Sequence, residues 1–102
     1  MIKRSELRKA YDKAIAFFRE NPKRWTKGKL WTSDGCMCLA GRISFELGHD
    51  PEKELNEFRK SASEADTIIR LCTGYSVIGV NDMSVNIHNM INRAETKIGA
   101  RL

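Results

Sequence analysis

The chain has 102 residues, a formal net charge of +5 at pH 7 and a hydrophobic fraction of 41%. That length allows one domain with a modest core, and the balance of apolar and charged residues excludes a disordered or fibrous protein. No apolar run approaches the roughly 18 residues that a membrane span needs, and the charged N-terminus lacks the apolar stretch of a secretory signal. We therefore expect a single cytoplasmic domain, residues 1–102, with no membrane partner.

Positive charge is concentrated in the first third of the chain. Residues 1–31 contain ten Lys and Arg against three Asp and Glu, whereas residues 32–102 contain eight against ten. A basic end on a mildly acidic body favours an anionic partner, either a nucleic acid, an acidic protein or a membrane surface. The alternative is a solvated face that only keeps the protein soluble.

Apolar residues at helical spacing predict a first helix over residues 5–20, with Ser5 as its cap. Asn21-Pro22 ends this helix, because proline disfavours the helical conformation of the residue before it. Residues 23–35 form a connector with a weak β pattern near residues 29–34.

The second predicted helix covers residues 36–47. Ala40-Gly41 at its centre removes side-chain bulk, and a glycine inside a helix costs about 1 kcal/mol relative to alanine. Close approach of another element offsets that cost. We therefore expect Cys38 and Ala40 in the core and a neighbouring element against Gly41.

The second half of the chain predicts three further helices and one β element. Asp50-Pro51 is typical of a helix start, and a serine-rich break at residues 61–63 separates that helix from another that ends at Cys72. Residues 75–80 are apolar and rich in β-forming side chains, which predicts a β element.

A polar turn at Asn81-Asp82 precedes the last predicted helix, residues 85–98. Helical spacing places Val85 and His88 on its inward face. We expect Asn81-Asp82 to form a turn in which the Asp82 carboxylate accepts hydrogen bonds from backbone N–H groups at the start of this helix. The alternative is a ligand-binding or catalytic role for the pair.

Three short motifs together resemble a known family. They are Trp25-x-x-Gly28, Gly35-x-x-Cys38-Leu39-x-Gly41, and Asn81-Asp82 before a closing helix. Over roughly residues 7–95 they are similar to a family of small uncharacterised proteins of actinobacteria and bacteriophages, with the patterns Trp-x-x-Gly, Gly-x-x-Cys-Leu-x-Gly-Ala and Trp-Asn-Asp. Arg42 and Val80 stand where that family has Ala and Trp. The resemblance implies a structural role for the motif residues and a phage-like origin, and it implies no chemistry.

The cysteines raise two chemical hypotheses. Three cysteines without a secretory signal favour reduced thiols. Cys38 near a helix start is a candidate nucleophile with a histidine, His49 or His88, as base, and the alternative is a packed cysteine. Zinc bound by Cys36, Cys38, Cys72 and His88 is the second hypothesis, but the C-x-C spacing is uncommon in structural zinc sites. We expect neither a catalytic residue nor a metal or cofactor.

Tryptophans interleave with the basic residues of the connector. Lysine and arginine can neutralise phosphates while Trp25 and Trp31 stack on unpaired bases, a pattern that fits single-stranded nucleic acid. Charge alone carries no sequence specificity, and the alternative for Trp25 is to anchor the loop.

The expected fold is mainly α, a single-domain bundle of four to five helices. The expected function is that of a small non-enzymatic protein, phage-encoded, that binds a host bacterial protein and modulates or inhibits it, for example a defence system. A nucleic-acid-binding regulator is the first alternative and a cysteine-dependent enzyme the second. The expected partner-binding residues are Lys23, Arg24, Lys27 and Lys29 in the connector and Arg8, Lys9 and Lys13 in the first helix.

Overall fold

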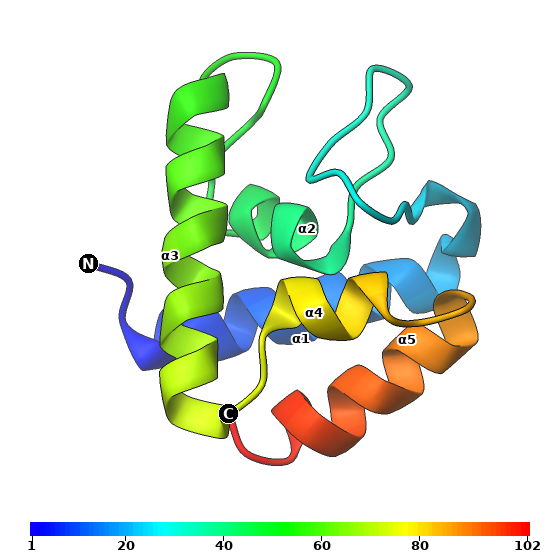
Figure 1. Ribbon diagram of the computed structural model, residues 1–102. Helices are drawn as coiled ribbons and strands as arrows, with labels where there is room; N and C mark the ends of the chain where they lie inside the picture. Colours follow the sequence, from blue (N-terminus) through cyan, green and yellow to red (C-terminus); the bar gives the residue numbers. More distant parts are fainter.

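Three helices pack around one short central helix, and a fifth helix closes the base of the bundle (Figure 1). The computed structural model describes residues 1–102. Its α-helices are α1 (Arg4–Glu20), α2 (Leu39–Glu46), α3 (Leu55–Thr73), α4 (Val77–Asp82) and α5 (Ile87–Ala94). A 3-10 turn (Pro22–Arg24) follows α1, and a π-helical turn (Glu95–Gly99) continues α5. The expected mainly α single domain is confirmed.

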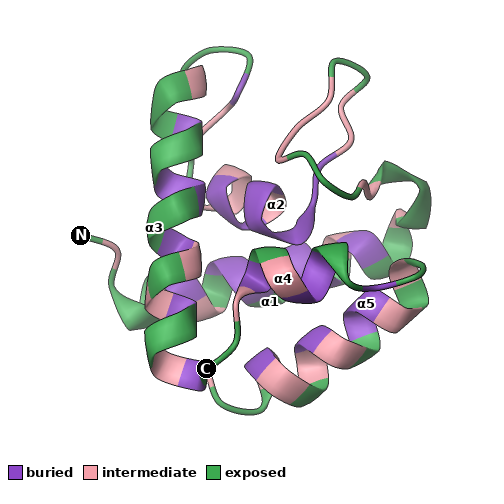
Figure 2. Cartoon of the chain, viewed as in Figure 1, coloured by how far each residue is buried: buried purple, intermediate pink, exposed green.

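The core lies where α1, α3 and α4 meet α2. The buried side of each helix is turned inward, and α2 is buried along most of its surface (Figure 2). The largest fully buried side chains include Tyr11, Phe18, Phe58, Leu39 and Ile43. The radius of gyration of 12.0 Å is close to the roughly 13 Å expected of a compact domain of this length. No helix is both long and apolar enough to cross a membrane.

Helix α1 ends as the sequence predicts. Asn21 leaves the helical conformation before Pro22, and its side-chain amide donates a hydrogen bond to the carbonyl oxygen of Phe17 (3.0 Å). The start differs slightly, because the residue before the first turn is Lys3, which provides no side-chain cap, and Ser5 lies inside the helix.

Helix α2 is three residues shorter than expected at its start. Residues 36–38 are extended because Met37 forms β-bridges with Trp25 on one side and Trp31 on the other. The β element expected near residues 29–34 is therefore reduced to one bridging residue, Trp31. Cys38 caps α2, with its sulfur accepting a hydrogen bond from the Gly41 amide (3.4 Å).

Helix α3 runs without the break expected at residues 61–63. Ser61 and Ala62 are buried on its inner side, and small side chains there allow α3 to lie close to α2. The hydroxyl of Ser44 in α2 donates to the carbonyl oxygen of Phe58 (2.8 Å). The helix start expected at Asp50-Pro51 was also wrong, because Asp50 instead closes a turn by accepting the amide of Glu52 (2.9 Å).

Residues 75–80 contribute to a helix, which corrects the β element expected there. Ser76 caps α4 by accepting the Gly79 amide (3.1 Å), and Asp66 of α3 accepts both the Ser76 hydroxyl (2.9 Å) and the Ile78 amide (3.2 Å). Val77 and Val80 are buried. These caps and this burial outweigh the β preference of the branched side chains.

The last helix begins two residues later than expected. Asn86 caps α5 by accepting the Asn89 amide (2.8 Å), so Val85 lies before the helix. Met90, Ile91 and Ala94 lie inside, whereas Val85 is 79% exposed and His88 is also exposed. The inward placement of Val85 and His88 was therefore wrong.

Candidate functional site

Asn81 fastens the connector to the core. Its side-chain oxygen accepts hydrogen bonds from the Trp25 indole Nε1 (2.6 Å) and the Leu39 amide (3.0 Å). Its side-chain nitrogen donates to the Thr26 carbonyl (3.2 Å) and to Asp82 Oδ1 (3.0 Å). Asn81 is fully buried, and all of these bonds join segments distant in sequence except the one to Asp82. One amide side chain therefore holds together the connector, the start of α2 and the end of α4.

Further contacts hold the connector at other points along its length. Asp82 Oδ1 accepts the Gly28 amide (3.0 Å), and backbone bonds join Met37 to Arg24 and Thr26 (3.0 Å each). Asn81-Asp82 was expected to form a turn whose carboxylate caps the last helix. This expectation was wrong, because the pair ends α4, Asp82 binds the connector, and Asn86 caps α5.

The connector also packs directly on α2. A Cβ atom added at Gly41 would lie 2.0 Å from the Leu30 carbonyl oxygen, well inside van der Waals contact. This close backbone approach confirms the neighbouring element expected at Gly41. Cys38 and Ala40, at 3% and 1% exposed, confirm the expected core positions. The connector is thus an ordered segment with a fixed position on the helices.

All four cations of the connector project from this ordered segment into solvent. Lys23, Arg24, Lys27 and Lys29 are exposed, and none of them forms an ion pair. The Arg24 guanidinium lies beside Gly35, whose φ of +88° is a backbone conformation that favours glycine. The connector's carboxylate, Asp34, is held by the Thr32 hydroxyl, which lowers the pKa of Asp34.

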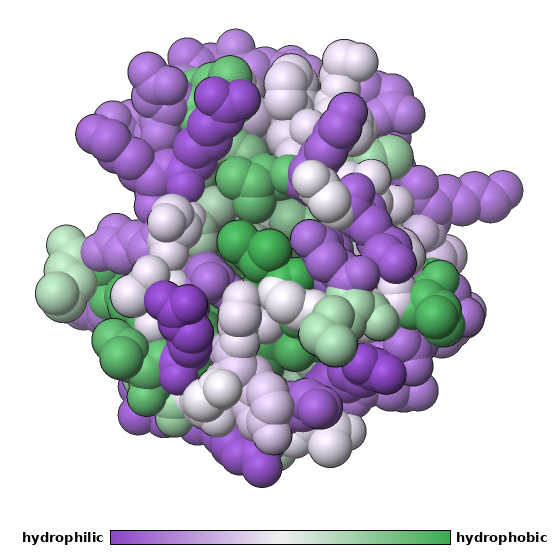
Figure 3. Space-filling view, viewed as in Figure 1, coloured by the Kyte–Doolittle hydropathy of each residue, from purple (hydrophilic) through white to green (hydrophobic).

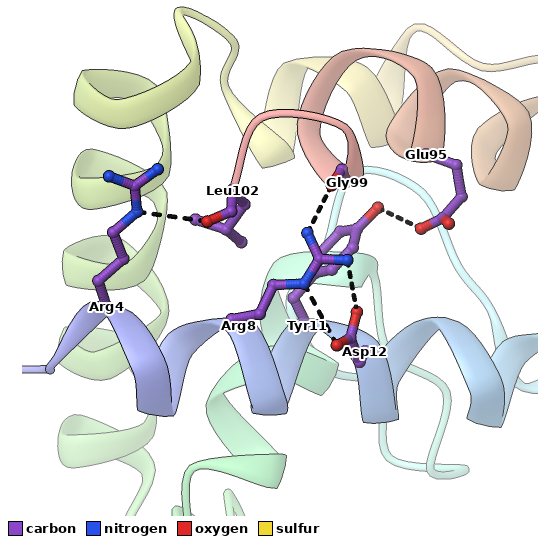
Figure 4. Close-up of polar contacts among 7 residues, drawn as sticks. All are labelled: Arg4, Arg8, Tyr11, Asp12, Glu95, Gly99 and Leu102. Atoms are coloured by element: carbon purple, nitrogen blue, oxygen red, sulfur yellow. Dashed lines mark hydrogen bonds and ion pairs between the residues drawn. The ribbon is translucent and has the colours of Figure 1, made fainter.

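The cations of α1 are placed differently. Arg8 donates to the Gly99 carbonyl (2.5 Å) and pairs with Asp12 (3.1 Å), so its charge is used within the chain (Figure 4). Arg4 likewise donates to the Leu102 carbonyl oxygen (3.3 Å), which fixes the C-terminus against α1. Lys9 and Lys13 are exposed on the outer side of α1, with no ion pair.

Tyr11 completes this attachment of the C-terminal segment. It is fully buried, and its hydroxyl donates to Glu95 Oε1 at the start of the π-helical turn (2.7 Å, Figure 4). Burial and the neighbouring carboxylate raise the pKa of Tyr11 well above its ordinary value. The contact joins residues 84 positions apart, and this structural role accounts for the burial that raises the pKa of Tyr11.

The cysteine and the two histidines considered for thiol chemistry border three different hollows. Burial raises the pKa of Cys38 to about 11, which leaves almost no thiolate at neutral pH. His88 is exposed on α5 and borders a hollow with Phe18 and Ile91, whereas Cys38 borders a different hollow with Asp82. His49 is bonded to Glu54 (2.8 Å).

The structure contains no cluster of side chains that could serve as zinc ligands. No three Cys, His, Asp or Glu side chains lie together in an arrangement that could hold a metal ion. Cys36 and Cys72 are half-buried, and the Cys36 thiol faces the Lys23 carbonyl (3.6 Å).

Two adjacent hollows lie beside the basic connector. The first, of about 240 Å³, lies between the connector and α3, and the second, of about 230 Å³, lies between the connector and α4. Both are bordered by Lys29 and Leu30. The sequence gives no signal for these hollows, because their walls come from segments far apart along the chain.

Comparison with known proteins adds no relative, since no protein-family model, no curated protein and no solved structure matches this chain.

Proposed function

We propose that this protein acts without chemistry, by docking its basic connector on an acidic surface of another protein and altering what that protein does. The observation that carries the proposal is the set of four exposed, unpaired cations on an anchored segment. Uncompensated cations attract an anionic surface over several ångströms. Because the connector is already ordered, less conformational entropy is lost when it binds.

The anchoring of the tryptophans favours a protein partner over a nucleic acid. The Trp25 indole is bonded to Asn81 and packs against the core, and Trp31 is half-buried in a bridge with Met37. The Trp25 ring is held against the core and the Trp31 backbone is fixed by its bridge, whereas proteins that bind single strands present aromatic rings for stacking. The apolar hollows next to Lys29 also suit a protein surface.

We extend this proposal on the motif resemblance to a bacteriophage and actinobacterial family. The partner is then a host bacterial protein in the cytoplasm, and docking modulates or inhibits it, for example within a defence system.

Two double charge reversals test the proposal. Lys27→Glu with Lys29→Glu changes the connector, and Lys3→Glu with Arg70→Glu makes the same change of net charge at exposed, unpaired positions outside the expected partner-binding residues. Each purified protein is immobilised and exposed to a bacterial lysate, with and without nuclease. We expect a protein that survives nuclease, is lost with the connector variant and is retained with the control variant.

Two outcomes would contradict the proposal. Recovery of nucleic acid alone would show a nucleic-acid-binding protein. Retention of the same protein by the connector variant would show that the connector's charge is only a solvated surface. Thermal melts of both variants check that they remain folded, since exposed substitutions usually change stability by less than about 0.5 kcal/mol each.

A further inference from the structure

The two hollows beside the connector form one groove with an apolar floor. Leu30 lies between them, and they share Lys29. Apolar side chains gather in the hollowed centre of this face, with hydrophilic side chains on both sides (Figure 3). The groove's apolar lining is Leu30, Trp31, Leu55, Phe58, Cys38 and Ile78.

Charge is distributed unevenly around this floor. Lys29 and Arg59 border the hollow next to α3, and neither forms an ion pair. Asp82 borders the hollow next to α4, but its Oδ1 already accepts hydrogen bonds from the Gly28 amide and the Asn81 side chain. At the hollow next to α3 both rim charges are therefore cations, which complement carboxylates on an occupant.

We propose that this groove binds an acidic amphipathic helix of the partner protein. Apolar side chains three or four residues apart on such a helix are neighbours and fill the two hollows on either side of Leu30. Carboxylates flanking them pair with Lys29 and Arg59. A peptide that binds as an added β-strand would need an unpaired sheet edge to join, and this protein has only isolated β-bridges.

This inference rests on the proposed function and adds to it the kind of partner segment. In the proposed function the connector supplies the charge that attracts the partner. In the groove, burial of apolar side chains supplies the affinity, because interface energy is concentrated in a few desolvated apolar or aromatic anchors. The two statements can therefore fail separately.

Three synthetic helical peptides serve as probes in a titration followed by amide chemical shifts. The first carries leucines along one face and glutamates elsewhere, the second replaces the leucines with glutamine, and the third replaces the glutamates with lysine. We expect the first to shift the amides of Lys29, Leu30, Arg59 and Ile78 and to bind at least about tenfold more tightly than the others.

Matched variants locate the binding. Arg59→Glu is compared with Arg70→Glu, another exposed arginine of α3 that does not border the groove. Ile78→Glu is compared with Val85→Glu, an exposed apolar residue outside it. We expect the groove variants to weaken the first peptide at least about fivefold and the controls to leave it within about twofold.

The outcomes separate the two proposals. Equal binding of the leucine and glutamine peptides, with shifts confined to the connector, would overturn the groove and leave the proposed function standing. Equal binding of the lysine peptide would also overturn the groove. If neither acidic peptide bound, and a single-stranded oligonucleotide shifted the connector amides, both the groove and the proposed function would be refuted.

Discussion

Replacing Gly41 with alanine tests how the connector is held on α2. The new Cβ would lie 2.0 Å from the Leu30 carbonyl oxygen and 2.9 Å from the Leu30 carbonyl carbon, both backbone atoms that cannot rotate away. Overpacking a well-packed site costs about 1–3 kcal/mol, and contact with backbone places this site at the upper end. Alanine returns up to about 1 kcal/mol of helix propensity. We expect a net loss of about 2 kcal/mol.

Thermal unfolding followed by circular dichroism measures this loss. For a domain of this size, about 2 kcal/mol lowers the melting temperature by about 8–16 °C. Gly79→Ala is the matched control, because a Cβ there would lie 3.4 Å from the Ser76 Cβ, which is ordinary contact inside another helix. We expect the control to melt at or above the wild-type temperature. A Gly41→Ala protein that melts as the wild type does would refute the packing described here.

Three further predictions follow from the buried groups. Asn81→Ala removes the acceptor of the Trp25 indole and the Leu39 amide, so we expect the free energy of unfolding in a denaturant titration to fall by about 2–3 kcal/mol and tryptophan fluorescence to shift to the red. An unchanged denaturation midpoint would contradict this prediction. At pH 8, Cys38 should react with a thiol reagent about a hundredfold more slowly than a free cysteine, because burial raises its pKa from 9.0 to about 11. If peptide mapping found Cys38 labelled as fast as a free thiol, the enzyme hypothesis would be reopened. Tyr11 stays neutral in the folded protein, whereas in the unfolded chain it ionises above pH 10.0, so its contribution to folding stability is complete below that pH and is lost as the pH rises. Melting temperatures should therefore fall more steeply above pH 10.0 in the wild type than in Tyr11→Phe, and parallel curves would contradict this.

Local signals predicted the parts of the fold that local interactions decide. Apolar spacing and Asn21-Pro22 predicted α1, and Ala40-Gly41 predicted a close neighbour for α2. The assignment of residues 75–80 failed because its deciding group lies elsewhere. Asp66, ten residues before Ser76, accepts the hydrogen bonds that help to fix the start of α4. The valines and the isoleucine of α4 have a β preference, and their local sequence does not reveal this distant acceptor.

The candidate site was predictable only in part for the same reason. The sequence predicts a basic connector between two helices, and the structure shows its four cations exposed. It also marks Asn81 and Trp25 as motif residues. It does not show that they contact each other, because they lie 56 positions apart and meet only when α4 packs against the connector. The groove depends on the same long-range packing, so its walls cannot be assigned from spacing.

The rate at which the captured partner associates with this protein, measured over a range of salt concentrations, tests the central claim most directly. Charge at an interface mainly raises the association rate, by about 10-fold to 1,000-fold. For Lys27→Glu with Lys29→Glu we predict association at least about tenfold slower and nearly independent of salt, while Lys3→Glu with Arg70→Glu keeps the wild-type rate and salt dependence. Equal rates and equal salt dependence for the wild type and the connector variant would contradict the claim that the connector is the docking surface.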